Sequence, residues 1–207
     1  MSRPLLITDC DEVLMHMVAH FQEWLTEDHD IHFAFETGKF AEALTHTPSG
    51  ETLPDERVWE LLWRFFREEM DRQTMVPGAF EALTRIGQVA DIVVLTNLGH
   101  DAQPLRVAQL AGHGLHYEVV CNQGGKGTAA REIIDRHEPT VTVFVDDLAI
   151  HHASVAKHAP NTRRLHMVAE PRLAPSIAAA EAAHARIDDW PTATAWILEK
   201  FEQGAAS

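Results

Sequence analysis

Five short apolar runs, the last four of which follow one another closely from residue 91 onward, constrain the fold most strongly. They are LLITD (5–9), DIVVLTN (91–97), YEVVCN (117–122), VTVFVDD (141–147) and RRLHMVA (163–169). Each has the length and the β-branched content of a buried strand, and segments that can form helices separate the last four. This alternation predicts βαβ units and therefore an α/β fold, with a Rossmann-like parallel sheet flanked by helices.

Two of the expected crossover helices have clear stop signals. AQPLRVAQLAG (102–112) can end at Gly112, and GTAAREIIDRHEP (127–139) is ended by Pro139. The segment from residue 171 onward also looks helical, and we expect its stretch TATAWILEKF (192–201) to pack onto the core.

The interval of roughly eighty residues between the first strand and the second is far longer than an ordinary crossover. It contains VLMHMVAHFQEWL (13–25) and ERVWELLWRFFREEM (56–70), in which apolar residues recur at helical spacing. We therefore expect a small helical subdomain over residues 15–76. It would be inserted after the first strand of an α/β core domain that comprises residues 1–14 and 77–207.

Composition limits the class of protein. The chain has 207 residues, of which 45% are hydrophobic and 23% charged, which is typical of a soluble globular protein. Its formal charge of −14 argues against nucleic acid or an anionic membrane as a partner. With two isolated cysteines and no apolar stretch long enough for a signal peptide or a membrane span, the expected location is the cytoplasm.

Polar residues stand at or just after four of the predicted strands. Parallel strands with right-handed crossovers bring their carboxyl ends to one edge, where ligands bind. Four carboxylates at that edge would repel one another unless a cation intervenes, and Mg²⁺ suits carboxylates, waters and phosphate oxygens. The residues concerned are Asp9, Asp11, Thr96, Asn97, Lys126, Asp146 and Asp147.

This combination of groups suits phosphoryl transfer. Asp9 can attack phosphorus and form an aspartyl phosphate. Asp11, kept protonated by its acidic neighbours and by burial, can give a proton to the leaving oxygen and later take one from the attacking water. Mg²⁺ and Lys126 would neutralise the charge of the transferred group.

The motifs DCDEVL, VVLTN, GGKG and VFVDD, in this order, resemble the four motifs of the haloacid dehalogenase-like superfamily over about residues 5–170. The resemblance implies a Mg²⁺-dependent phosphatase with Asp9 as the nucleophile and Asp11 as the general acid and base. Thr96, which would bind the phosphoryl group, Asn97 and Lys126 would be the substrate-binding residues, and Lys126 would also be the lysine of the third motif.

The resemblance also implies a metal site and a cap. The Asp9 side chain, the Asp11 backbone carbonyl, Asp146 and Asp147 would bind Mg²⁺, and the helical insertion would close over a small substrate. The chain departs from the family at Glu12, where the family usually has glycine. That departure bears on the geometry of the loop after the first strand and on substrate choice.

Three alternatives stay open on the sequence. A phosphonate hydrolase would use a cap lysine as a Schiff base, and Lys39 is the sole candidate. In that branch of the family the second aspartate of the first motif is replaced, so the intact Asp11 argues against it. A 2-haloacid dehalogenase is disfavoured for the same reason, because it needs no acid for its leaving group. A catalytically silent protein of this fold could bind a ligand or regulate, although Asp9, Asp11, Lys126 and Asp146 are all intact.

Overall fold

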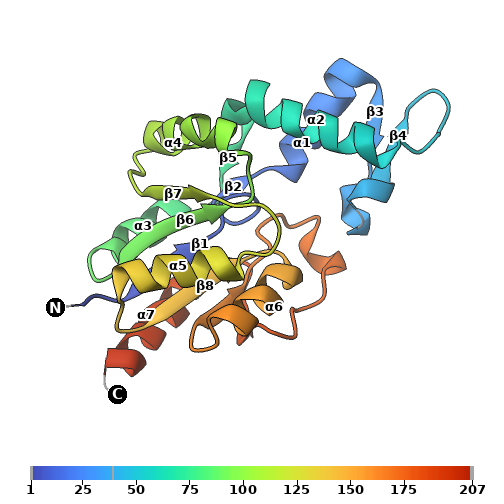
Figure 1. The fold of residues 1–207 in the computed structure, drawn as a ribbon. Helices are drawn as coiled ribbons and strands as arrows, with labels where there is room; N and C mark the ends of the chain where they lie inside the picture. The colour runs from blue at the N-terminus through green and yellow to red at the C-terminus, as the bar shows by residue number, and fades with distance from the viewer. Residues whose placement is uncertain (1, 39, 206–207) are drawn as a thin grey trace.

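A six-stranded parallel sheet forms the centre of the protein (Figure 1), whose computed structural model describes residues 2–38 and 40–205. The five runs expected to be strands are all present in it, and the short β10 is an addition. The strand order is β10-β9-β8-β1-β6-β7. The bounds are β1 Leu5–Thr8, β6 Asp91–Thr96, β7 Glu118–Cys121, β8 Thr142–Asp146, β9 Arg163–His166 and β10 Ala185–Arg186.

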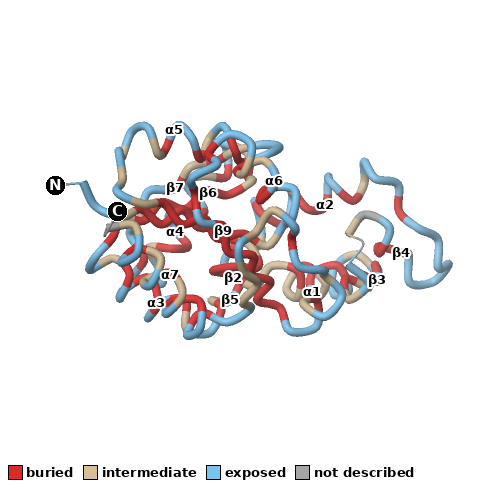
Figure 2. The backbone as a smooth tube through the Cα atoms, turned by 90° about the horizontal axis from the view of Figure 1, so that it is seen from below, coloured by how far each residue is buried: buried red, intermediate tan, exposed pale blue. Residues whose placement is uncertain are grey.

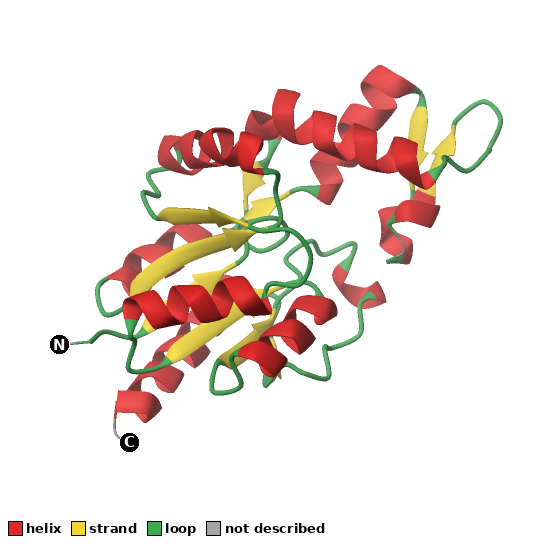
Figure 3. Cartoon of the chain, viewed as in Figure 1, coloured by secondary structure: helices red, strands yellow, loops and turns green. Residues whose placement is uncertain are grey.

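The sheet is buried because its central strands are apolar on both faces. Alternate residues point to opposite faces, so Leu6 belongs to one core cluster while Leu5 and Ile7 belong to another. Helices α3 (Ala79–Gly87) and α7 (Trp190–Ala205) cover the first face, and α5 and α6 cover the second (Figures 1 and 3). The α/β prediction is confirmed.

The crossover helices also form where the sequence predicts them. Helix α4 ends at Gly112, as predicted. Helix α5 ends at His137; the next residue, Glu138, has a left-handed backbone, and Pro139 follows it. Their bounds are α4 Gln103–Gly112, α5 Gly127–His137 and α6 Ala149–His158. None of the helices within the described ranges is both long and apolar enough to span a membrane.

The expectation of helix from residue 171 onward is wrong for residues 171–189, because the last helix, α7, begins only at Trp190. Between these points the chain forms a short 3-10 turn (Ala174–Ser176), the strand β10 and irregular segments. Tertiary hydrogen bonds override the helical preference of the alanines: the Arg164 side chain donates to the carbonyl of Ala182, and the Ala180 N–H donates to His166.

The long interval between β1 and β6 folds into helices and two small antiparallel pairs. The first predicted helix begins only at Val18, because Met15 and His16 form β2 and pair with β5. The elements are β2 Met15–His16, α1 Val18–His29, β3 Ile31–Phe33, β4 Leu44–His46, α2 Asp55–Glu68 and β5 Thr74–Met75, with 3-10 turns at Phe35–Thr37, Ala41–Ala43, Met70–Arg72 and, after β6, His100–Ala102.

This inserted segment has an aromatic core of its own. Phe21 of α1 lies 5.3 Å from Phe65 of α2 between ring centroids, and both are fully buried. In Figures 1 and 2 the segment extends from the end of the sheet where β1 leads into it. Its description as a subdomain over residues 15–76 stays a prediction.

Candidate active site

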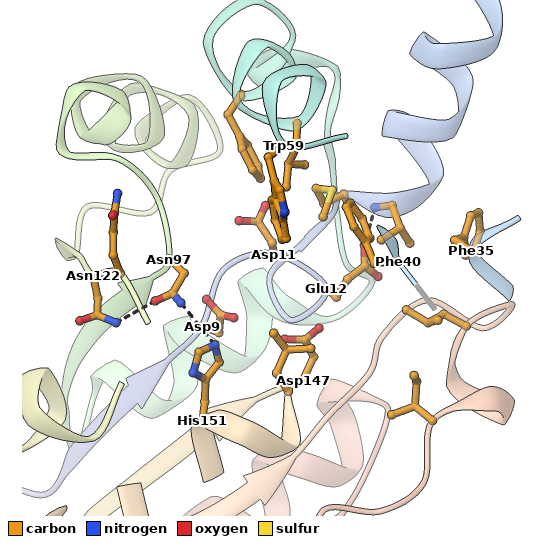
Figure 4. A pocket seen from close by; sticks show the side chains of 18 of the residues that line it. Asp9, Asp11, Glu12, Phe35, Phe40, Trp59, Asn97, Asn122, Asp147 and His151 are labelled. Atoms are coloured by element: carbon orange, nitrogen blue, oxygen red, sulfur yellow. Dashed lines mark hydrogen bonds between the residues drawn. The ribbon is translucent and has the colours of Figure 1, made fainter. Parts of the chain in front are cut away.

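Several of the polar residues expected at the strand ends lie together at the carboxyl edge of the sheet (Figure 4). Asp9 directly follows β1, and Asp146 is the last residue of the neighbouring strand β8. Asn97 follows β6 on the other side of β1, and Lys126 immediately precedes α5. Because β1 lies between β8 and β6, Asp9 has polar residues from the strand ends on both of its sides.

A buried lysine joins two of the carboxylates. The Lys126 Nζ lies 2.7 Å from Oδ1 of Asp9 and 2.7 Å from Oδ2 of Asp146. Burial acts to lower the pKa of Lys126, but these two carboxylates outweigh it and raise that pKa above its ordinary value. The amine is therefore a fixed positive charge beside the Asp9 carboxylate.

Asp147 joins these two carboxylates in a cluster of three. Oxygens of Asp9, Asp146 and Asp147 all lie within 4.8 Å of one another. Burial raises the pKa of Asp9 to about 6 against the opposing charge of Lys126. Burial, together with the charges of Asp146 and Asp9, raises the pKa of Asp147 well above its ordinary value. The cluster carries more negative charge than one lysine neutralises.

This donor set fits a magnesium ion. Mg²⁺ prefers hard oxygen ligands, and a divalent charge would offset the surplus of carboxylates. Asp9, Asp146 and Asp147 are the residues that could hold it with their side chains. The Asp11 carboxylate is not among the clustered oxygens. The expectation that Asp11 contributes its backbone carbonyl to the metal site stays a prediction.

Asp11 instead faces a buried arginine that the sequence analysis did not identify. Arg106 Nη2 donates to both oxygens of Asp11, at 2.7 and 2.8 Å, and Gln73 donates to Oδ1 at 2.9 Å. Arg106 also donates to Gln73 and Gln109 at 2.8 and 2.7 Å, and its side chain is fully buried. Held in this way, both oxygens of Asp11 act as acceptors, whereas the expected proton donor needs a hydroxyl.

Glu12 occupies a backbone conformation that favours glycine. Its φ is +58°, in the left-handed region, at the position where the family motif usually has glycine. Its Oε1 accepts hydrogen bonds from the N–H groups of Met17 and Val18, both at 2.7 Å, at the start of α1. Burial raises the pKa of Glu12 to about 7 despite these bonds. Oε2 is buried without a hydrogen-bond partner among the described residues.

Thr96 and Asn97 differ in how their side chains are used. The Thr96 hydroxyl is buried and has no hydrogen-bond partner in the described part of the chain. Asn97 is held by the loop that carries Lys126: it donates to the Gly124 carbonyl at 2.9 Å and accepts from Asn122 at 2.9 Å. Both lie where the sequence places them; their binding role stays a prediction.

Three histidines complete the surroundings of the site. His151, in the first turn of α6, lies 3.5 Å from Asn97, and burial lowers its pKa to about 4, so its imidazole is neutral at pH 7. A ring nitrogen of His152 bonds the Asp146 carbonyl at 3.0 Å, and one of His166 bonds the Asp147 carbonyl at 2.7 Å. These bonds fix the backbone of the acidic pair.

A cavity of about 470 Å³ opens from these residues toward the inserted segment. Asp9, Asp147, Asn97 and His151 line one end of it, and Figure 4 shows Phe35, Phe40 and Trp59 toward the other end. Lys39, the one candidate for a Schiff-base lysine, lies outside the described residues.

Comparison with known proteins identifies the fold. No family model and no curated protein matches the sequence. Solved structures do match: a haloacid dehalogenase-like family hydrolase from Xanthomonas campestris has a TM-score of 0.62 at 14% identity, with 100% of this chain and 99% of that chain covered.

Two further structures resemble the chain over nearly its whole length. The proposed HAD hydrolase YfnB of Bacillus subtilis, bound to magnesium, has a TM-score of 0.65 at 14% identity, covering 95% of this chain and 99% of its own. A 2-haloacid dehalogenase from Pseudomonas syringae has a TM-score of 0.56 at 15% identity, covering 96% and 99%. The chain has the haloacid dehalogenase-like fold.

Proposed function

We propose that this chain is a Mg²⁺-dependent phosphatase that hydrolyses a small phosphomonoester through an aspartyl-phosphate intermediate. The observation that carries the proposal is the grouping of Asp9, Asp146 and Asp147 within 4.8 Å, with the Lys126 amine 2.7 Å from Asp9. A carboxylate nucleophile, further oxygen ligands and a buried cation are the groups that this reaction requires.

Each residue has a defined part in the reaction. The Asp9 carboxylate forms a bond to phosphorus while the bond from phosphorus to the ester oxygen breaks, and water then releases inorganic phosphate and regenerates Asp9. Lys126 holds positive charge beside the reacting oxygens, and the Thr96 hydroxyl is available to donate to a phosphoryl oxygen. When bound by the acidic cluster, Mg²⁺ supplies further neutralisation of phosphoryl charge.

The proton for the leaving alcohol is assigned to Asp11 on one condition. Its side chain must turn away from Arg106 during turnover, because both oxygens accept hydrogen bonds from that guanidinium. The side chain is 16% exposed, so it is not enclosed on all sides. Substrate entry into the cavity, which Asp11 lines, would provide the occasion for this rotation.

A second candidate is haloacid hydrolysis. A halide leaves without a proton, so this reaction is compatible with Asp11 held by Arg106. One of the similar structures is a 2-haloacid dehalogenase. A phosphonate hydrolase or a catalytically silent protein of this fold remains a further alternative, without a contact among the described residues that favours it.

One set of assays separates these functions. The wild-type protein should hydrolyse para-nitrophenyl phosphate with Mg²⁺ and stop in excess chelator, and Asp9→Asn should be inactive while its circular dichroism and unfolding midpoint stay near wild type. Halide release from chloropropionate with no phosphate release would favour the second candidate. Phosphate release by Asp9→Asn at the wild-type rate would reject Asp9 as the nucleophile.

A further inference from the structure

Resting on the proposed function, we propose that the preferred substrate is the phosphate ester of an uncharged, apolar alcohol, with an aromatic or branched aliphatic group next to the ester. The basis is the wall of the cavity that faces the reacting residues. Its volume of about 470 Å³ accommodates a small organic group, and Trp59, Trp63 and Phe66 of α2 contribute to the wall.

The chemistry of the cavity is divided between its two ends (Figure 4). Of the carboxylates that line it, those of Asp9 and Asp147 lie beside the reacting groups, whereas Asp11 and Glu12, in the loop after β1, lie nearer to Trp59 and Phe40. The other end is formed by aromatic and aliphatic side chains of the inserted segment and of the loop after β9. A phosphoryl group at the polar end would leave the rest of the substrate against apolar surface.

The apolar wall is held in place by packing between rings. Phe40 stacks on Trp59 with ring centroids 6.1 Å apart and planes at 27°, and it meets Phe33 edge-on at 5.1 Å. Trp63 packs against Phe66 at 6.2 Å. Phe33 and Phe66 are buried, whereas Trp59 is 47% exposed. An exposed tryptophan at the edge of an apolar cavity gains contacts when an apolar ligand enters.

Three kinds of substrate fit this wall poorly. Among the described residues that line the cavity none is lysine or arginine, so a carboxylate or second phosphate on the substrate would find no cation among these residues. A sugar would bring several hydroxyl groups against aromatic and aliphatic side chains, where they would be left without partners. A quaternary ammonium group can bind aromatic faces, but the two carboxylates nearest to them are already engaged: Asp11 is paired with Arg106, and Glu12 accepts from two N–H groups at the start of α1.

The test compares esters of primary alcohols, for which the chemical step is similar. Phenethyl phosphate and neohexyl phosphate should exceed glycerol phosphate in kcat/KM by at least about tenfold, since contacts in an apolar pocket discriminate by factors of that order. Choline phosphate has the shape of neohexyl phosphate but carries a positive charge, and it should have a lower kcat/KM than neohexyl phosphate. Para-nitrophenyl phosphate with Mg²⁺ serves as the reference for turnover itself.

A matched pair of variants locates the effect. Trp59→Ala should lose roughly tenfold in kcat/KM for phenethyl phosphate and a smaller factor for glycerol phosphate. Phe80→Ala removes an aromatic ring of similar exposure, 41%, from α3 outside the cavity lining, and should match the wild type on both esters.

The outcomes distinguish the two levels of the proposal. Equal kcat/KM for phenethyl and glycerol phosphate, a preference for choline phosphate over neohexyl phosphate, or equal losses in Trp59→Ala for both esters would overturn the apolar-substrate inference and leave the phosphatase standing. Absence of phosphate release from every ester, para-nitrophenyl phosphate included, would overturn the phosphatase and the inference with it.

Discussion

The guanidinium of Arg106 donates to both carboxylate oxygens of Asp11, at 2.7 and 2.8 Å, from a position that is closed to solvent. Two glutamines extend this pair into a buried network: Gln73 bonds Asp11 as well as Arg106, and Gln109 bonds Arg106 and the Met70 carbonyl. The network joins the loop after β1 to α4 and to the end of the inserted segment, so we expect it to support the fold.

Replacement of Arg106 by methionine tests this support. Removing one partner of a buried ion pair leaves the other without compensation, so Arg106→Met should lower the free energy of unfolding by about 3 kcal/mol. Urea denaturation measures the loss. The control is Arg131→Met, which breaks an exposed arginine–aspartate pair with Asp135 and should leave the urea midpoint of unfolding almost unchanged. Similar midpoints for the two variants would contradict a structural role of the Arg106 network.

The sequence predicts those parts of the fold and site that depend on local pattern. The strand-end residues Asp9, Asp146 and Asp147 could be located because apolar runs predict strands and parallel strands share one working edge. Arg106 could not be located in this way. It lies inside an ordinary amphipathic helix pattern, and its partner Asp11 is 95 positions away in the chain.

The failures of prediction have related physical causes. The alanine-rich stretch before Trp190 has high helix propensity, but contacts with Arg164 and His166 hold it in another shape. The cavity wall combines Phe35, Phe40 and α2 with Ile177, segments whose approach depends on the tertiary fold. Such contacts have no local sequence signal, apart from the departure at Glu12, which marked the loop as unusual.

Glu12 should make stability depend on pH. Its pKa is 4.5 as an ordinary glutamate and about 7 in the folded protein, mainly because of burial. Between these two values the folded state binds more protons than the unfolded state, so the free energy of unfolding falls as pH rises. The contribution is complete below about pH 4.5 and is lost as pH rises through 7.

Replacement of Glu12 by glutamine isolates this effect, because the amide oxygen can still accept from Met17 and Val18. Relative to Glu12→Gln, the wild type should lose up to about 3 kcal/mol between pH 5 and pH 8. Urea denaturation of both proteins in chelator, at several pH values, measures the difference. Parallel pH profiles would show that Glu12 does not change its charge over this range.

Magnesium should stabilise the folded protein through the acidic cluster. An ion that binds only the folded state adds about 2.7 kcal/mol when its concentration is 100 times its dissociation constant. Mg²⁺ should therefore raise the Tm of the wild type, and Asp147→Asn should reduce that increase because one clustered carboxylate is lost. Asp135→Asn, on the exposed side of α5, is the control and should respond as the wild type does. An equal Tm increase in all three proteins would place the ion elsewhere.

The role of Asp11 is decided by its dependence on the leaving group. An alkyl alcohol needs a proton as its bond to phosphorus breaks, whereas para-nitrophenolate leaves with little help. General acid assistance is typically worth about 10²- to 10⁴-fold in rate. Asp11→Asn should therefore reduce the hydrolysis of phenethyl phosphate by a factor in this range and that of para-nitrophenyl phosphate much less. Without Asp11 to activate water, the aspartyl phosphate on Asp9 should also accumulate and be detectable after acid quenching.

The contact with Arg106 supplies a rival explanation that the same experiment tests. The asparagine oxygen can still accept from Arg106, but the charge that compensates the guanidinium is lost, so a lower rate of Asp11→Asn does not by itself identify Asp11 as the acid. If the variant merely distorts the site, both esters should lose the same factor, no phosphoenzyme should be trapped, and Arg106→Met should show the same uniform loss. If Asp11 is the acid, Asp11→Asn should reduce the hydrolysis of phenethyl phosphate by a larger factor than that of para-nitrophenyl phosphate. Arg106→Met should reduce both rates by the same factor, because this variant retains the carboxyl group that carries the proton.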